Sequence, residues 1–176
     1  MGRLTAILHR KYNEGTIALR DKGDSGLLVL DAASVARALS LSDWIEVVEQ
    51  SLRGASDGTA LQGIRQILPL PDDKGPGRVL SMMFCAVQHP ACFGAKVISV
   101  FPDNFSRGLD SHRGAVLLFD PDDGALVSLL HGGEITAART AAASAVATRA
   151  LAREDSRILG VVGYGEQAYR HVEAIT

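Results

Sequence analysis

A glycine-rich turn near the end of the chain has the residue types and spacing of a phosphate-binding loop. The apolar run 158–162 has the length of a β-strand, and Gly-Tyr-Gly-Glu-Gln-Ala follows it directly at 163–168. In such a turn the glycines let the backbone approach a pyrophosphate, and the next helix directs its N–H groups and positive dipole end at the anion. The pattern predicts a dinucleotide, NAD or NADP, bound by Gly163, Tyr164, Gly165, Glu166, Gln167 and Ala168.

Two arginines are candidates for binding a carboxylate. Arg65 and Arg139 could each offer two parallel N–H donors to one carboxylate group. Arg139 lies in the first turn of a predicted helix, whose dipole would add to the attraction for an anion. The alternatives are an outward-facing strand residue for Arg65 and a solvated surface arginine for Arg139.

Lys96 is the candidate for proton transfer. It stands in an apolar strand between Ala95 and Val97, where partial desolvation would lower the pKa of its ammonium group. A lysine of this kind suits proton transfer at a substrate nitrogen, or contact with a substrate carboxylate. The alternative is an edge-strand lysine that discourages aggregation.

The histidines and cysteines do not form a recognisable metal site. His112 and His131 are more often structural, and Cys85 and Cys92 form neither a disulfide framework nor a zinc motif. We therefore expect two reduced thiols in or near strands, and no metal centre.

Composition limits the class of protein. Of the 176 residues 47% are hydrophobic and 22% charged, which favours a packed core over disorder. A net charge of −2, without a basic block, argues against nucleic acid as a partner. No stretch approaches 18 apolar residues, and residues 1–22 are mixed and charged rather than a signal peptide, so a cytoplasmic protein without membrane contact is expected.

The first two thirds of the chain read as strands with two early helices. Residues 1–25 look like an extension, 27–30 like a strand, and 31–39 like a helix capped by Asp31. Ser42 could cap a second helix that ends near Gly54, followed by a loop over 56–59. Apolar runs separated by turn residues predict five further strands in an antiparallel or mixed sheet, over 62–70, 78–87, 93–100, 115–119 and 125–130.

The pattern changes to α/β near residues 132–136. Thr136 could cap a long alanine-rich helix over 137–152, and the strand 158–162, the glycine turn and a last helix follow. The expected fold class is α/β, with a mixed-sheet substrate and dimerisation domain before the first βα unit of a doubly wound (Rossmann) domain. The expected divisions are an extension over 1–25, the substrate domain over 26–133 and the nucleotide domain over 134–176.

The stretches Gly94–Val97, Glu134–Ala142 and Gly163–Ala168 stand in this order in the chain. Together these three stretches resemble the ornithine cyclodeaminase/mu-crystallin family, and the likeness runs over 27–176. Arg65 sits where the family keeps an arginine ahead of Lys96, whereas His131 stands where relatives commonly carry an acidic residue. Residues 111–118 and 167–169 look closer to the mu-crystallin (ketimine reductase) side. The three stretches are Gly94-Ala95-Lys96-Val97 with Asn104 and Gly108 following, Glu134–Ala142 with its Arg-Thr-Ala-Ala element, and the glycine turn.

The resemblance implies a homodimeric, NAD(P)-dependent enzyme of α-amino or cyclic imino acids. Lys96 would be catalytic, Arg65, Lys96 and Arg139 would bind the substrate, and Thr140 would join the glycine turn in binding the cofactor. Ketimine reduction and deaminating cyclisation of ornithine to proline both remain open. So do a non-catalytic nucleotide- or ligand-binding protein and a gene remnant without function.

The position of the glycine turn leads to one further expectation. An acidic residue about twenty positions further on usually binds the ribose hydroxyl, and the sequence does not reach it, so NAD and NADP are not distinguished. The strand 158–162 also lacks later parallel neighbours. We therefore expect the chain as given to be inactive, with its last forty residues poorly packed, aggregation-prone or held by a partner.

Overall fold

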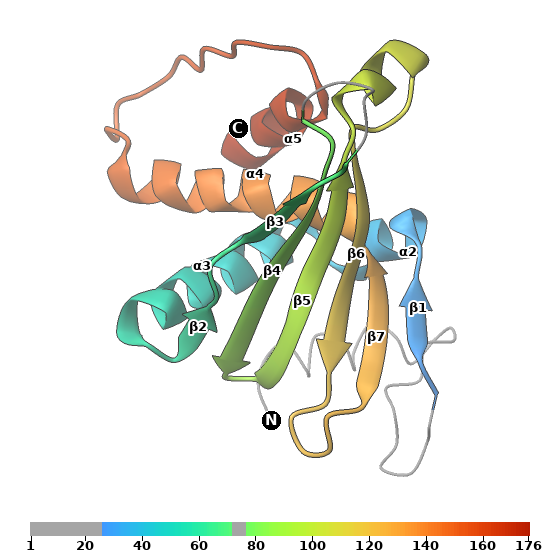
Figure 1. Ribbon diagram of the computed structural model, residues 1–176. Coiled ribbons are helices and arrows are strands. Elements are labelled where there is room, and N and C mark those ends of the chain that lie inside the picture. Colours follow the sequence, from blue (N-terminus) through green and yellow to red (C-terminus); the bar gives the residue numbers. More distant parts are fainter. Residues whose placement is uncertain (1–25, 72–76) are drawn as a thin grey trace.

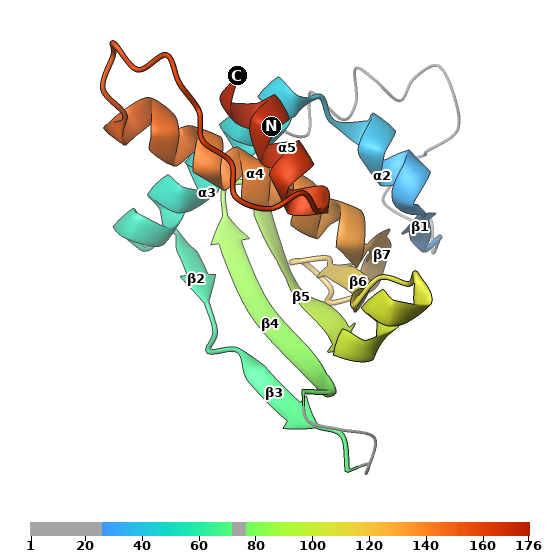
Figure 2. The ribbon, with the colours of Figure 1, turned by 90° about the horizontal axis from the view of Figure 1, so that it is seen from above.

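The computed structural model describes residues 26–71 and 77–176, so the extension expected over 1–25 lies outside it. These residues form one mixed seven-stranded sheet with helices α2 to α5 gathered on one side (Figures 1 and 2). The strand order is β1-β7-β6-β5-β4-β2, and β3 also pairs with β4. The α/β class and the mixed sheet are confirmed.

The sheet is antiparallel except at one edge, where β1 runs parallel to β7. The strand predicted over 62–70 is wrong as one element, because it divides into two short strands separated by 63–65. That interruption places Arg65 in the connection. The strands are β1 (Leu28–Leu30), β2 (Ala60–Gln62), β3 (Gln66–Pro69), β4 (Val79–Gln88), β5 (Ala91–Val100), β6 (His112–Phe119) and β7 (Leu126–His131).

Local capping chemistry sets the two early helices. Asp31 caps α2 (Ala32–Ala38) as predicted, because its carboxylate accepts a hydrogen bond from the Ser34 N–H at 2.8 Å. Helix α3 (Leu41–Asp57) begins earlier than predicted and includes the first half of the expected loop 56–59. Its N-cap is Ser40, not Ser42, because Ser40 and Asp43 form a reciprocal capping box. It ends at Gly58, whose φ of 84° suits glycine, rather than at Gly54.

Helix α4 (Gly132–Leu151) begins five residues before the predicted start. Its cap is His131, whose Nδ1 accepts a hydrogen bond from the Glu134 N–H at 3.2 Å, so Thr136 lies inside the helix and is not a cap. The early start follows from a close approach of two glycines. A Cβ atom on Gly132 would lie 2.8 Å from the Gly114 carbonyl oxygen on β6, and only a residue without Cβ fits there.

Alanine side chains let α4 lie directly on the sheet, as the composition of the helix predicts. Its buried face is formed by Ala137, Ala138, Ala141, Ala142 and Ala145. Ile98 of β5 is buried beneath the helix layer.

Cys85 and Cys92 lie on β4 and β5 as free thiols, as expected, and burial raises the pKa of both.

The strand predicted over 158–162 is wrong. These residues have no strand pairing in the described structure, and the side chains of Ile158 and Val162 are fully or almost fully exposed. An extended segment becomes a strand only when a neighbour pairs with its backbone, and none of the described strands reaches it. The last helix, α5 (Glu166–Ile175), is present as predicted.

A short 3-10 helix, η1 (Pro102–Arg107), connects β5 to β6. Within the described ranges, none of the helices combines the length and apolar character needed to cross a bilayer. Helix α4 packs against α3 on one side and α5 on another, and the domain boundary near 132–136 stays a prediction.

Candidate anion and dinucleotide site

Lys96 lies on the helix-covered face of β5, at the centre of the candidate site. Its cross-strand neighbours are Met83 and Val116, which are apolar. The lysine Nζ donates a hydrogen bond to Oγ1 of Thr136 on α4 at 3.2 Å. That hydroxyl in turn donates to the Gly132 carbonyl oxygen at 2.6 Å, so it can only accept from the lysine.

Arg65 and Arg139 come close enough to act on Lys96 electrostatically. Partial burial, followed by the positive charges of Arg139 and Arg65, together lower the pKa of Lys96 from 10.5 to about 8. Partial burial and Arg65 also lower the pKa of Arg139. The structure therefore brings together all three cations that the sequence predicts, from the 63–65 connection, β5 and α4.

The three cations have no acidic partner in the part of the chain that the structure describes. The ion pairs found there engage other arginines, for example Arg78 with Asp103 at 2.7 Å and Arg170 with Glu134 at 2.6 Å. Like charges held together without a counterion repel each other and attract an anion. The arrangement can bind a carboxylate and hold a proton donor beside it.

One part of the sequence argument is wrong for Arg139. Because α4 begins at Gly132, Arg139 is the eighth residue of the helix and lies beyond its first turn. The field of a helix dipole falls off within the first turn, so it adds little at this arginine.

The glycine turn leads into α5 as predicted. Gly163 has a φ of 109°, which favours glycine, and Gly165 is the N-cap of α5 without any side-chain cap. A Cβ atom on either glycine would meet nothing within 4 Å, and Tyr164 is exposed. Glu166, Gln167 and Ala168 form the first turn of α5, so their N–H groups are free to bind an anion.

The ion pair between Arg170 and Glu134 ties the helix of this turn to the helix of the cation site. Arg170 belongs to α5 and Glu134 to the first turn of α4, and the pair is partly buried. Thr140 also lies on α4, but its hydroxyl donates to the Thr136 carbonyl oxygen at 2.6 Å. The hydrogen bond found for Thr140 stays within α4, and its cofactor role stays a prediction.

The sequence analysis missed Thr136 as part of the site. The spacing contained a signal, because residues three apart on a helix share a face and Thr136 precedes Arg139 by three. Interpreting Thr136 as a helix cap hid that relation.

The two candidate histidines have local partners: His131 caps α4, and His112 Nδ1 lies 2.9 Å from the Ser111 hydroxyl. The described residues hold no group of three metal-ligating side chains.

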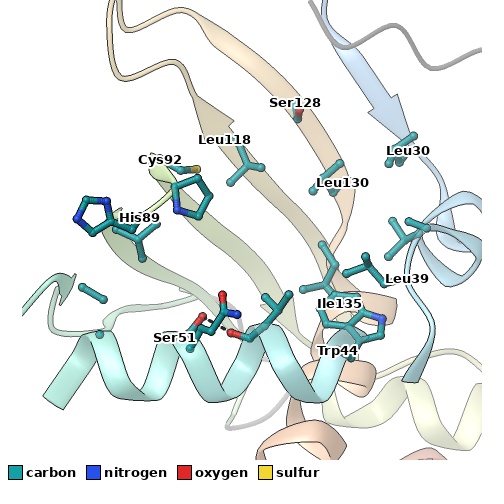
Figure 3. Close-up of a pocket in the computed structure, with 18 of the residues that line it drawn as sticks. Leu30, Leu39, Trp44, Ser51, His89, Cys92, Leu118, Ser128, Leu130 and Ile135 are labelled. Carbon is teal, nitrogen blue, oxygen red and sulfur yellow. Dashed lines mark hydrogen bonds between the residues drawn. The ribbon is translucent and has the colours of Figure 1, made fainter. Parts of the chain in front are cut away.

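A cavity of about 520 Å³ lies between α3 and the sheet, separate from the three cations (Figure 3). Trp44, Leu39 and Ile135 lie toward one end, and His89 and Cys92 lie toward the other. Its wall is mainly apolar and includes none of Arg65, Lys96 and Arg139. It is therefore distinct from the anion site.

Comparison with known proteins matches this fold and this site to one family. The model of the ornithine cyclodeaminase/mu-crystallin family matches residues 27–176. Ketimine reductase mu-crystallin of Mus musculus is 35% identical over 120 residues, which are 68% of this chain and 37% of that protein.

Solved structures agree in fold. The chain superimposes on Thermococcus litoralis Delta(1)-pyrroline-2-carboxylate reductase, in complex with NADH and L-proline, with a TM-score of 0.78 and 34% identity. Superposition on an archaeal alanine dehydrogenase dimer with bound NAD gives a TM-score of 0.75, at 27% sequence identity. The match covers 85% of this chain in both cases, but only 45% and 44% of the two solved chains.

The chain thus spans less than half the length of these relatives. The family match nevertheless extends over nearly all of it and includes every residue of the candidate site. The chain belongs to the ornithine cyclodeaminase/mu-crystallin family.

Proposed function

We propose that this chain supplies the substrate-binding cations and the first part of the dinucleotide site of an NAD(P)-dependent reductase of cyclic imino acids. The observation that carries the proposal is the convergence of Lys96, Arg65 and Arg139 without an acidic partner. The named relatives, a ketimine reductase and a pyrroline-2-carboxylate reductase, support the substrate class.

The residues of the glycine turn fit a dinucleotide. Both glycines face open space where a Cβ would stand, and the first N–H groups of α5 have no side-chain cap. These N–H groups and the positive end of the helix would hold the pyrophosphate. When bound, the reduced nicotinamide supplies a hydride to the carbon of the substrate imine.

The three cations would have two different roles, binding the substrate carboxylate and donating a proton. Arg65 and Arg139 bind and orient its carboxylate through charge-assisted hydrogen bonds. Lys96 holds a proton at Nζ for the imine nitrogen, and a pKa near 8 leaves both of its protonation states accessible near neutral pH. The apolar side chains of Met83 and Val116 keep water from the lysine on the sheet side.

Binding measurements with the Arg139→Gln variant test this proposal. We expect saturable NADH binding by nicotinamide fluorescence, unchanged in the variant, because the turn and the cation site are built from different residues. Binding of L-proline or pyrroline-2-carboxylate should weaken about 10- to 100-fold, since a charge-assisted pair of hydrogen bonds is lost.

Arg149→Gln on the same helix is the matched control, because Arg149 pairs with Glu49 at the surface. An equal loss of affinity for L-proline or pyrroline-2-carboxylate in Arg139→Gln and Arg149→Gln would contradict the proposed site. Reduction of the imine by the 176-residue chain would contradict the inactivity expected from the sequence. Ammonia release from L-ornithine, without net change in the nicotinamide, would assign a cyclodeaminase instead.

We further propose that the chain forms a homodimer through the open face of its sheet. The helices leave this face uncovered (Figure 2), and Phe93 and Phe119 stack on it with ring centroids 5.5 Å apart. A contiguous apolar surface of this kind often marks a protein–protein interface. Exposed apolar side chains on this face include Leu61, Leu68, Leu80, Phe84 and Phe93.

Sedimentation velocity of Phe84→Asp tests the dimer. We expect the wild-type chain to sediment as a dimer and the variant as a monomer, because a carboxylate would be buried unpaired in the interface. Phe105→Asp is the control, since Phe105 is 81% exposed on η1, away from the sheet face. A monomeric wild-type chain, or a dimer that tolerates Phe84→Asp, would contradict this interface.

A further inference from the structure

The hydroxyl group of Thr136 is the one polar group that the described structure places in direct contact with Nζ of Lys96. The lysine otherwise has apolar cross-strand neighbours, Met83 and Val116, and two arginines whose charges repel it. A flexible four-carbon side chain in this setting has nothing else to fix its end group. Thr136 is therefore placed to decide where the ammonium group points.

The direction of this hydrogen bond is fixed by a second one. A hydroxyl has a single hydrogen, and that of Thr136 is donated to the Gly132 carbonyl oxygen at 2.6 Å. Only its lone pairs remain for Lys96, so the lysine must donate. The chain of hydrogen bonds runs from Nζ through the hydroxyl to the helix backbone, and it cannot be reversed while the helix is intact.

We infer that Thr136 is a positioning residue, which holds one Nζ–H of Lys96 and thereby directs the remaining hydrogens at the ligand held by Arg65 and Arg139. As an ammonium group Lys96 carries three hydrogens, one of which Thr136 holds. One of the other two passes to the substrate nitrogen, and Lys96 remains as a neutral amine that still donates to Thr136. This inference rests on the proposed function only for the identity of the group that receives the proton.

The fold explains why a threonine of α4 reaches a lysine of β5. Gly132 and Gly114 meet without side chains, and the buried alanines of α4 lower the helix onto the sheet. Thr136 and Arg139 are three residues apart, so the hydroxyl and the guanidinium leave the helix on the same face. One helix face thus provides both the group that orients the proton donor and a group that binds the anion.

The titration of Lys96 in the 176-residue chain tests this assignment without any need for turnover. Competitive acetylation with acetic anhydride over a range of pH, read by mass spectrometry, gives the pKa of this lysine directly. An acceptor oxygen stabilises the charged ammonium more than the neutral amine, so its loss lowers the pKa. We expect a midpoint near pH 8 in the wild type, and a decrease of about half to one pH unit in Thr136→Val.

Three further variants separate the hydroxyl from the shape of the side chain. Thr136→Ser keeps the hydroxyl and should retain the wild-type midpoint, whereas Thr136→Ala should shift it as Thr136→Val does. Thr148→Val is the matched control, because it makes the same substitution in the same helix away from Lys96. Binding of L-proline should change less than about threefold in Thr136→Val, since both arginines remain.

An unchanged midpoint in both Thr136→Val and Thr136→Ala would overturn the assignment, and so would an equal shift in Thr136→Ser. These outcomes are distinct from a failure of the proposed function. A chain that binds neither NADH nor L-proline, yet shows the expected shifts, would retain the pairing of Thr136 with Lys96 and lose only the proposed substrate.

Discussion

Replacing Lys96 with methionine should abolish imine reduction in a version of the protein that turns over the imine, and should make the 176-residue chain more stable at neutral pH. The loss of a positioned proton donor typically costs about 10²- to 10⁴-fold in rate. The gain in stability has a different cause, since Lys96 is a partly desolvated cation near two arginines without an acidic partner. Methionine of similar length fills the same space without charge.

The sign of the pH dependence follows from the pKa of Lys96. The folded-state value of about 8 lies below the ordinary value of 10.5, so the folded protein binds fewer protons than the unfolded chain between these pH values. The free energy of unfolding of the wild type should therefore rise from pH 8 to 10.5, and the penalty is fully present below pH 8. Because Lys96 is only partly buried, we expect a gain of about 1 kcal/mol for Lys96→Met at pH 7.

Urea denaturation at pH 7 and pH 10, with reductase assays beside it, measures both effects. Lys96→Met should remove the part of the pH dependence that belongs to this lysine, and the two proteins should differ less at pH 10 than at pH 7. Arg107→Met on η1 is the control, since it removes a cation from an exposed position outside the sheet. Unchanged catalysis in Lys96→Met would contradict the role of this lysine as the proton donor.

Replacing Gly114 with alanine should destabilise the protein by about 3 kcal/mol or more, as expected when overpacking forces the backbone to move. A Cβ atom there would lie 2.0 Å from the Val97 carbonyl oxygen and 2.7 Å from the Ile98 Cα. Both atoms belong to the backbone of β5, so no side chain can rotate away. Gly132 of α4 closely approaches the Gly114 backbone, so a backbone shift at Gly114 would also displace the start of α4.

Thermal unfolding of Gly114→Ala, compared with Gly160→Ala, tests this packing. A Cβ atom on Gly160 would meet nothing within 4 Å, so that control should unfold within a few degrees of the wild type. In Gly114→Ala the hydrogen bond between Lys96 and Thr136 should also be lost, because α4 must move away from β5. A melting temperature equal to that of the control would contradict the close approach of β5, β6 and α4.

Much of the local structure could be predicted from the sequence, because it depends on interactions between near neighbours. The Asp31 cap, the apolar runs of β4 to β7 and the alanine face of α4 are each fixed within a few residues. The glycine turn is equally local, because a positive φ at Gly163 and an uncapped helix start at Gly165 need only those residue types. Lys96 was identified in the same way, from its apolar neighbours in one strand.

The remaining features depend on contacts between segments far apart in the sequence, and only the tertiary structure decided them. Residues 158–162 have the composition of a strand, but none of the described strands pairs with them, so they stay exposed and outside the sheet. Helix α4 starts at Gly132 because that glycine meets Gly114, and this contact turns Thr136 from an expected cap into the partner of a lysine forty residues away. The sequence by itself determined which residues could bind an anion and donate a proton. Their convergence was decided by packing, since it depends on how closely α4 can approach β5 and β6.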